Sequence, residues 1–212
     1  MAVSDPQNLL GLEFPPPEKK YIDLRRMFYL EGKPNLKGSL PVRFFDSLLL
    51  RSLGLLIGFG KKSSDPESEY NRLTGNFRRM GNIGRLMGHL GPLGRWLLGL
   101  NFRTYASMLV RQGICEVEKR TNYVEAAKDY LKIIDLFNFK VVVCGKDDHK
   151  VEYKLPECPL GYGQDDDVRV CMASMEFDNQ CIRRLGGGRS ILKEKIPGGG
   201  RECLVQVVPV GS

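Results

Sequence analysis

Apolar residues recur at helical spacing over residues 40–138. In SDPESEYNRLTGNFRRM, acids follow directly after Pro66, which is typical of the start of a helix. In EVEKRTNYVEAAKDYLKIIDLF, the apolar side chains of Val124, Ala127 and Ile134 fall on one side of a helix. The pattern therefore predicts a layer of amphipathic helices.

The middle of this region, from Arg78 to Cys115, contains no acidic residue and is rich in glycine. Four glycines recur at spacings of three, four and three residues, namely Gly81, Gly84, Gly88 and Gly91. On a helix they share one face and allow a second backbone to approach closely, although each costs about 1 kcal/mol relative to alanine. Pro92 limits how far such a helix runs. We therefore expect a close backbone contact here.

The pattern changes from helical to alternating at about Phe139. FKVVVC and KVEYKL predict two strands joined by the turn GKDDH, and SILKEKI and ECLVQVVPV predict a second hairpin around PGGGR. Between the hairpins, VRVCMASMEFDNQCIRRLG predicts one helix that ends at a glycine run. The predicted fold class is α+β, a helical N-terminal layer followed by a β-β-α-β-β antiparallel sheet unit that helix covers on one face.

Composition divides the chain into three regions. Residues 1–41 hold six of the twelve prolines and few periodic apolar positions, which predicts an extended arm. Residues 42–138 form a basic helical region, and residues 139–212 form the α+β unit. A chain of 212 residues can bury one substantial core, so we expect the helices and the α+β unit to pack as one domain.

The net charge of +7 is concentrated in residues 40–111, which hold eleven Lys or Arg against four Asp or Glu. A basic helix face attracts an acidic protein surface, anionic lipid or nucleic acid, or it is simply solvated. We expect a protein partner or a homo-oligomer to bind through the arm and the basic helices. Peripheral membrane contact is the alternative, and nucleic acid is not expected.

The cysteines and the N-terminal segment favour a cytoplasmic protein. Six cysteines without a C-x-x-C pair fall below the density of a secreted disulfide framework. The segment MAVSDPQNLLGLEFPPPEKK lacks the basic and apolar regions of a signal peptide. The two most apolar segments are interrupted by arginine and glycine and fall short of the roughly 18 apolar residues of a spanning helix. We therefore expect reduced thiols and no membrane span.

Three cysteines lie at the ends of predicted elements, where side chains from separate elements can converge. Cys158 follows the second strand, Cys171 begins the helix and Cys203 begins the last strand. Asp178 lies about two helical turns after Cys171 and shares its face, with Ser174 between them. A helix N-terminus favours a thiolate, so Cys171 is the candidate nucleophile or ligand. The alternative for each cysteine is a small buried hydrophobe.

A zinc or iron–sulfur site is another interpretation of the cysteines. Its ligands would be Cys158, Cys171 and Cys203, with Cys181 as a fourth, although these residues lack the short paired spacing of such sites. The two histidines of the chain have no partner at metal-binding or triad spacing. The carboxylates in GYGQDDD (161–167) fit helix capping, and a hard-cation site is the alternative there. The sequence therefore does not decide between zinc, an iron–sulfur cluster, a hard cation and no cofactor.

The last third of the chain holds ECP after a strand, then a helix that begins VRVC and contains an aspartate, then ILKEKIPGGGRECLVQVV. This order resembles the C-terminal part of the L-2-amino-thiazoline-4-carboxylic acid hydrolase-like family, which is similar to the 4-vinyl reductase small-molecule-binding domains. The matching positions are Cys158, Pro159, Cys171, Asp178, Gly200 and Cys203. The 4-vinyl reductase domains often carry a further cysteine before the glycine turn, where this chain has KEKIP. The resemblance implies a ligand pocket between sheet and helices, lined by thiols and one carboxylate.

Two functions follow from this resemblance. The first is a hydrolase-like enzyme that opens a C–N bond of a small heterocyclic or amide-like substrate, with Cys171 as nucleophile and Asp178 as proton carrier. Cys158, Ser174 and Cys203 would contact the substrate. The second is a non-catalytic small-molecule-binding or accessory subunit of a larger complex, in which the cysteines shape the pocket or hold a metal. Removal of Asp178 abolishes turnover in the first case and changes only affinity in the second.

Overall fold

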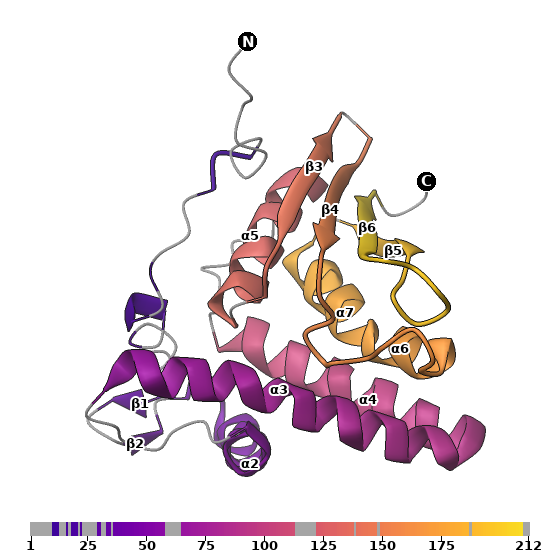
Figure 1. Ribbon diagram of the computed structural model, residues 1–212. Helices are drawn as coiled ribbons and strands as arrows, with labels where there is room; N and C mark the ends of the chain where they lie inside the picture. The colour runs from indigo at the N-terminus through magenta and orange to yellow at the C-terminus, as the bar shows by residue number, and fades with distance from the viewer. Residues whose placement is uncertain are drawn as a thin grey trace.

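The computed structural model describes residues 10–12, 16, 18–20, 22, 29–30, 33–34, 36–57, 65–112, 122–137, 139–147, 149–186 and 188–209. Cys115 and much of the predicted arm lie outside the described residues. Within them, helices combine with a four-stranded antiparallel sheet, which confirms the predicted α+β class (Figure 1). Two short strands in the region of the arm, β1 (Tyr29–Leu30) and β2 (Lys33–Pro34), pair with each other.

Long helices carry the apolar periodicity of the region before the sheet. They are α2 (Leu40–Ile57), α3 (Pro66–His89), α4 (Gly91–Arg111) and α5 (Tyr123–Leu136). Pro66 and Pro92 stand in the first turns of α3 and α4, where the N–H that proline lacks has no intrahelical partner in any case. Gly91 turns the chain between these two helices with a φ of 66°. The limit that Pro92 sets on the glycine-rich helix is therefore confirmed.

The sheet contains both predicted hairpins. Its strands are β3 (Val142–Lys146), β4 (Val151–Leu155), β5 (Arg189–Glu194) and β6 (Cys203–Val208), in the order β3-β4-β6-β5. The inner strands β4 and β6 join the hairpins, and their register places Leu155 opposite Cys203. The chain that leaves β4 and carries Cys158 therefore starts beside Cys203.

The predicted single helix between the hairpins is two helices, α6 (Val168–Ser174) and α7 (Glu176–Leu185), so that prediction was wrong. Met175 joins them with a ψ of −9°, which departs from straight α-helix. The side chain of Asp167 caps α6 by accepting a hydrogen bond from the backbone N–H of Arg169 at 2.8 Å. α7 ends at Gly186 in the left-handed conformation, with a φ of 95°, as the glycine run predicts.

Gly81, Gly84 and Gly88 form the predicted contact face on α3. The prediction was wrong for Gly91, which begins α4 and where a Cβ atom would meet nothing within 4 Å. A Cβ atom at Gly81 would lie 1.9 Å from the carbonyl oxygen of Leu160. One at Gly84 would lie 2.1 Å from the hydroxyl of Tyr162, and one at Gly88 would lie 2.6 Å from a valine methyl of α6. No side chain fits at these distances, so glycine is what allows the segment after β4 to rest on the backbone of α3.

Helices and sheet share one hydrophobic core, which includes Leu50 of α2, Leu109 of α4, Leu131 of α5 and Val205 of β6. Helix α7 lies between the α3–α4 hairpin and the sheet, because it packs against α4 on one side and against β5 on the other (Figure 1). None of the described helices combines the length and the hydropathy needed to cross a membrane.

Arginines of α3 and α4 pair with acids that precede or begin α6 and α7. The pairs are Arg85–Asp166, Arg95–Asp167 and Arg103–Glu176, with N–O distances of 2.7, 4.0 and 2.6 Å. The excess of basic residues that stands out in the sequence of these helices is therefore partly balanced within the fold.

Candidate functional site

A cavity of about 110 Å³ lies between the sheet, helices α3 to α5 and helices α6 and α7. Its walls are mostly apolar, and eight aromatic side chains contribute to them: Phe77, Phe102, Tyr105, Tyr130, Phe137, Phe139, Tyr162 and Phe177. An apolar cavity of roughly 150 Å³ in another protein holds benzene. The space here is smaller than that one, so it limits a ligand to about the size of a single ring.

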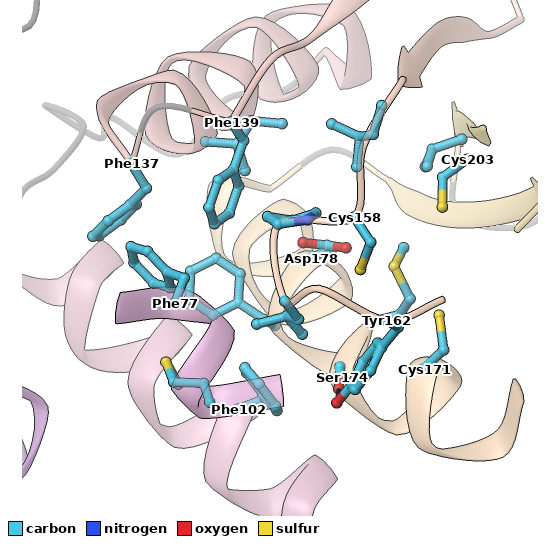
Figure 2. A pocket seen from close by; sticks show the side chains of 18 of the residues that line it. Phe77, Phe102, Phe137, Phe139, Cys158, Tyr162, Cys171, Ser174, Asp178 and Cys203 are labelled. Carbon is cyan, nitrogen blue, oxygen red and sulfur yellow. Dashed lines mark hydrogen bonds between the residues drawn. The ribbon is translucent and has the colours of Figure 1, made fainter. Parts of the chain in front are cut away.

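The aromatic rings gather at one end of the cavity. Phe77 of α3 meets Phe137 and Phe139 edge to face, with ring centroids 5.3 and 5.2 Å apart. Figure 2 shows these rings with Phe102 on one side and the cysteine sulfurs on the other. Edge-to-face packing of this kind fixes the orientation of the rings, because the positive edge of one ring meets the negative face of the next.

Five of the residues that the sequence singled out for a site line this one cavity. They are Cys158, Cys171, Ser174, Asp178 and Cys203. Cys158 comes from the segment after β4, Cys171 and Ser174 from α6, Asp178 from α7 and Cys203 from the start of β6. Their convergence agrees with the expectation from element ends, while the role of each in binding or catalysis stays a prediction.

Asp178 is the only carboxylate among the described residues that line the cavity. Its Oδ1 accepts a hydrogen bond of 2.5 Å from the hydroxyl of Tyr130, whose oxygen accepts one of 3.3 Å from the hydroxyl of Tyr153. Burial raises the pKa of Asp178 from 3.8 to about 7, and the hydrogen bond from Tyr130 opposes that rise. The carboxyl group can therefore exchange a proton near neutral pH.

The thiols of the cavity are held in their neutral form. Burial is the main cause that raises the pKa of Cys171 from 9.0 to about 12, followed by its proximity to Cys203, Cys158 and Asp178. Burial also raises the pKa of Cys158 and of Cys203. Burial of the Cys171 thiol in an apolar cavity therefore opposes the thiolate that the start of the helix was expected to favour, and the role of Cys171 stays a prediction.

Among the described residues, the three cysteines of the predicted metal site are not arranged as a ligand set. In the part of the chain that the structure describes, no group of three His, Cys, Asp or Glu side chains is placed to hold a metal ion. Cys158, Cys171 and Cys203 line one cavity without forming a ligand set, and Cys181 is buried and does not line it. Of the carboxylates before α6, Asp166 pairs with Arg85, and Asp167 caps the helix.

Ser174 and Tyr162 meet at the floor of the cavity. The two hydroxyl oxygens lie 3.2 Å apart, and the Ser174 hydroxyl also donates to the carbonyl of Val170 at 3.1 Å. Both polar groups are therefore satisfied by the protein itself. Ser174 then acts as an orienting group for Tyr162 as much as a contact for a ligand.

Arg85 of α3 binds the segment that carries Gly161, Tyr162 and Asp166 from outside the cavity. Its guanidinium donates to Asp166 at 2.7 Å and to the carbonyl of Gly161 at 2.6 Å, and it lies 5.4 Å from the ring centre of Tyr162. Together with the glycine face of α3, Arg85 holds Tyr162 against the cavity. Both Arg85 and the glycine face of α3 therefore hold the ring of Tyr162 in the wall of the cavity.

Several residues that complete this site were not predicted from the sequence. The main ones are Tyr130, Tyr153, Phe77 of α3 and Phe102 of α4. A signal for Tyr130 was present, because it lies on the apolar side of the best-defined helix, where a hydroxyl group needs a buried partner. No local signal marked Phe77 or Phe102, which lie 65 and 40 residues before the first strand of the sheet, β3 (Val142–Lys146).

Comparison of the chain with protein-family models, with curated proteins and with solved structures found no match. The resemblance to the thiazoline hydrolase-like family therefore rests on the short motifs of the last third of the chain.

Proposed function

We propose that this protein binds a small, single-ring molecule in the cavity, as a non-catalytic small-molecule-binding or accessory subunit. The observation that carries the proposal is the lining, which surrounds one carboxylate with aromatic rings and neutral thiols. Ligand sites of small molecules combine this kind of apolar wall with a few convergent polar groups. The thiols then shape the pocket and perform no nucleophilic step.

A matched pair of cysteine variants tests the location of the site. Cys158→Phe fills the cavity, whereas Cys144→Phe makes the same change at an exposed position of β3 that does not line it. We expect calorimetry with benzyl alcohol to show binding to the wild type and to Cys144→Phe, and at least tenfold weaker binding to Cys158→Phe. Equal binding to both variants, with unchanged circular dichroism, would place the ligand elsewhere.

A second candidate function is the hydrolysis of a C–N bond, which the pKa of Asp178 near 7 supports. The carboxylate would take a proton from a water molecule as that water attacks the ring carbon, and would return the proton to the leaving nitrogen. Turnover of L-2-amino-thiazoline-4-carboxylate by the wild type and its loss in Asp178→Asn would favour this function. This candidate stands second because the described lining offers no basic side chain to a substrate carboxylate.

We further propose that the protein works in a cytoplasmic complex through the α3–α4 hairpin. Leu86, Leu90, Leu93 and Trp96 are each 60–65% exposed there. Arg85, Arg95 and Arg103 of these helices already pair with acids, and this apolar face therefore suits a protein surface better than anionic lipid. Cys144, Cys158, Cys171 and Cys203 are free thiols, which supports a reducing compartment.

Trp96 reports on this face directly, because it is the only tryptophan of the chain. We expect sedimentation velocity to show self-association that a Leu90→Glu, Leu93→Glu variant abolishes, with a blue shift of the Trp96 emission in the associated wild type. A monomer whose Trp96 emission shifts only when anionic vesicles are added would favour the membrane interpretation instead.

A further inference from the structure

We infer that the ligand of the cavity carries a positive charge, and that the Asp178 carboxylate and the surrounding aromatic rings recognise a small aryl-alkyl ammonium or a protonated nitrogen heterocycle. This inference rests on the proposed function, because it specifies the ligand of the same cavity. It comes from three features of the site, which are the open carboxylate oxygen, the lack of an internal cation and the rings.

One oxygen of Asp178 is available to a ligand. Oδ1 accepts the hydrogen bond from Tyr130, and Oδ2 accepts none from any described residue. Asp178 is half-buried and lines the cavity, and Figure 2 shows its carboxyl group among the other side chains of the lining. Carboxylate oxygens usually satisfy more than one acceptor position. A ligand N–H donor at Oδ2 would therefore complete the site.

No described Lys, Arg or His lines the cavity beside this carboxylate, and Lys195, whose charge acts on Cys171, does not contribute to the pKa of Asp178. The groups that face it are the hydroxyls of Tyr130 on α5 and Tyr153 on β4, and the thiols of Cys171 on α6 and Cys203 on β6. Lys, Arg and His are absent from the described lining, and no basic group contributes to the pKa of Asp178. A buried carboxylate without a partner is unfavourable when ionised, so a cationic ligand is the partner that stabilises it.

The aromatic rings of the cavity also favour a cationic ligand. The faces of Phe and Tyr rings carry partial negative charge and attract cations, most strongly where water is excluded. Figure 2 shows Asp178 between the phenylalanines Phe77, Phe102, Phe137 and Phe139 and the cysteine side. An ammonium group at Oδ2 would thus keep its organic part among the rings. An anionic ligand would meet the carboxylate and the ring faces without a compensating donor.

The charge of Asp178 makes this recognition dependent on pH. With a pKa of about 7, the carboxyl group is mostly ionised at pH 8 and about one-tenth ionised at pH 6. The affinity for a permanently protonated amine should therefore fall about tenfold from pH 8 to pH 6. The affinity for a neutral ring should not fall over this range, because its binding does not require the charge.

The test compares three probes of similar size and different charge, benzylammonium, benzyl alcohol and benzoate, by calorimetry at pH 8. We expect benzylammonium to bind at least tenfold more tightly than either of the others. Asp178→Asn should reduce this preference to threefold or less while retaining the binding of benzyl alcohol. Glu157→Gln, which removes an exposed carboxylate beside Lys140, is the matched control and should keep the full preference.

Tyr130→Phe keeps the inference testable if Asp178→Asn does not fold. This variant keeps the carboxylate and removes the hydrogen bond that lowers its pKa. The preference for benzylammonium should persist, and its pH midpoint should move upward. An unmoved midpoint would overturn the inference.

Other outcomes separate the two proposals. Benzyl alcohol or benzoate binding as tightly as benzylammonium would overturn the inference while leaving the pocket proposal intact. Failure of all three probes to bind the wild type would overturn both.

Discussion

Replacing the carboxyl group of Asp178 by the amide of asparagine should change how the stability of the protein depends on pH. Below pH 3.8 this carboxyl is protonated in both the folded and the unfolded chain. Between pH 3.8 and about 7 the folded protein retains a proton that the unfolded chain has released. The stability that this proton contributes is therefore lost as the pH rises through 7, and no further loss follows above it.

The size of this loss of stability follows from the part of the range between pH 3.8 and about 7 that lies within the measured interval, pH 5 to pH 8. Between pH 5 and pH 8, the folded and the unfolded chain differ in the protonation of Asp178 over roughly two pH units. Each pH unit changes the free energy of unfolding by about 1.4 kcal/mol. Because Asp178 is only half-buried and solvent screens part of its charge, we expect the wild type to lose about 2–3 kcal/mol relative to Asp178→Asn over this window.

Urea unfolding at pH 5 and pH 8, followed by far-ultraviolet circular dichroism, measures this difference. Glu157→Gln is the control, because an exposed carboxylate should leave the pH dependence of the wild type in place. If the free energy of unfolding of Asp178→Asn parallels that of the wild type at both pH values to within about 0.5 kcal/mol, the raised pKa and the reasoning built on it are refuted.

Two further predictions concern the glycine face and the thiols. Gly84→Ala should destabilise the protein by about 1–3 kcal/mol in urea unfolding, because its Cβ would overlap the Tyr162 hydroxyl. The control is Gly75→Ala, in open space on the same helix, which should be neutral or stabilising by up to about 1 kcal/mol. Equal effects of the two variants on the free energy of unfolding would contradict the close contact. With the Cys115→Ser, Cys144→Ser background, iodoacetamide at pH 8 should modify Cys171 at least tenfold more slowly than free cysteine, and faster modification would indicate a thiolate.

Local patterns in the sequence were sufficient for the long helices and for both hairpins, but not for the break at Met175. They also placed three cysteines at element ends, and these cysteines line one cavity. Cys158 and Cys203 could be placed together because both stand at the ends of strands that the register then pairs. Cys171 and Asp178 were expected on one helical face, and both still line the cavity although Met175 breaks the helix between them. No proline or glycine marks that break, so spacing alone could not reveal it.

The chemistry of the site depended on packing and was not predictable from the sequence. A cysteine at a helix start has a low or a high pKa according to what surrounds it, and the surroundings of Cys171 come from distant elements. The same holds for the aromatic end, where Phe77 and Phe139 meet across more than sixty residues of chain. Hydrophobic periodicity indicates that such rings are buried and does not indicate which of them surround a cavity.

The glycine face of α3 also has a consequence for the comparison of this chain with others. Aromatic and aliphatic side chains around a cavity exchange with one another readily over evolutionary time, because volume matters more than identity. Gly81, Gly84 and Gly88 have no such substitutes while the segment after β4 rests on their backbone. A distant homologue that retains this architecture should therefore be recognised by G-x-x-G-x-x-x-G in a helix together with a later P-L-G-Y turn, even where the pocket itself has diverged.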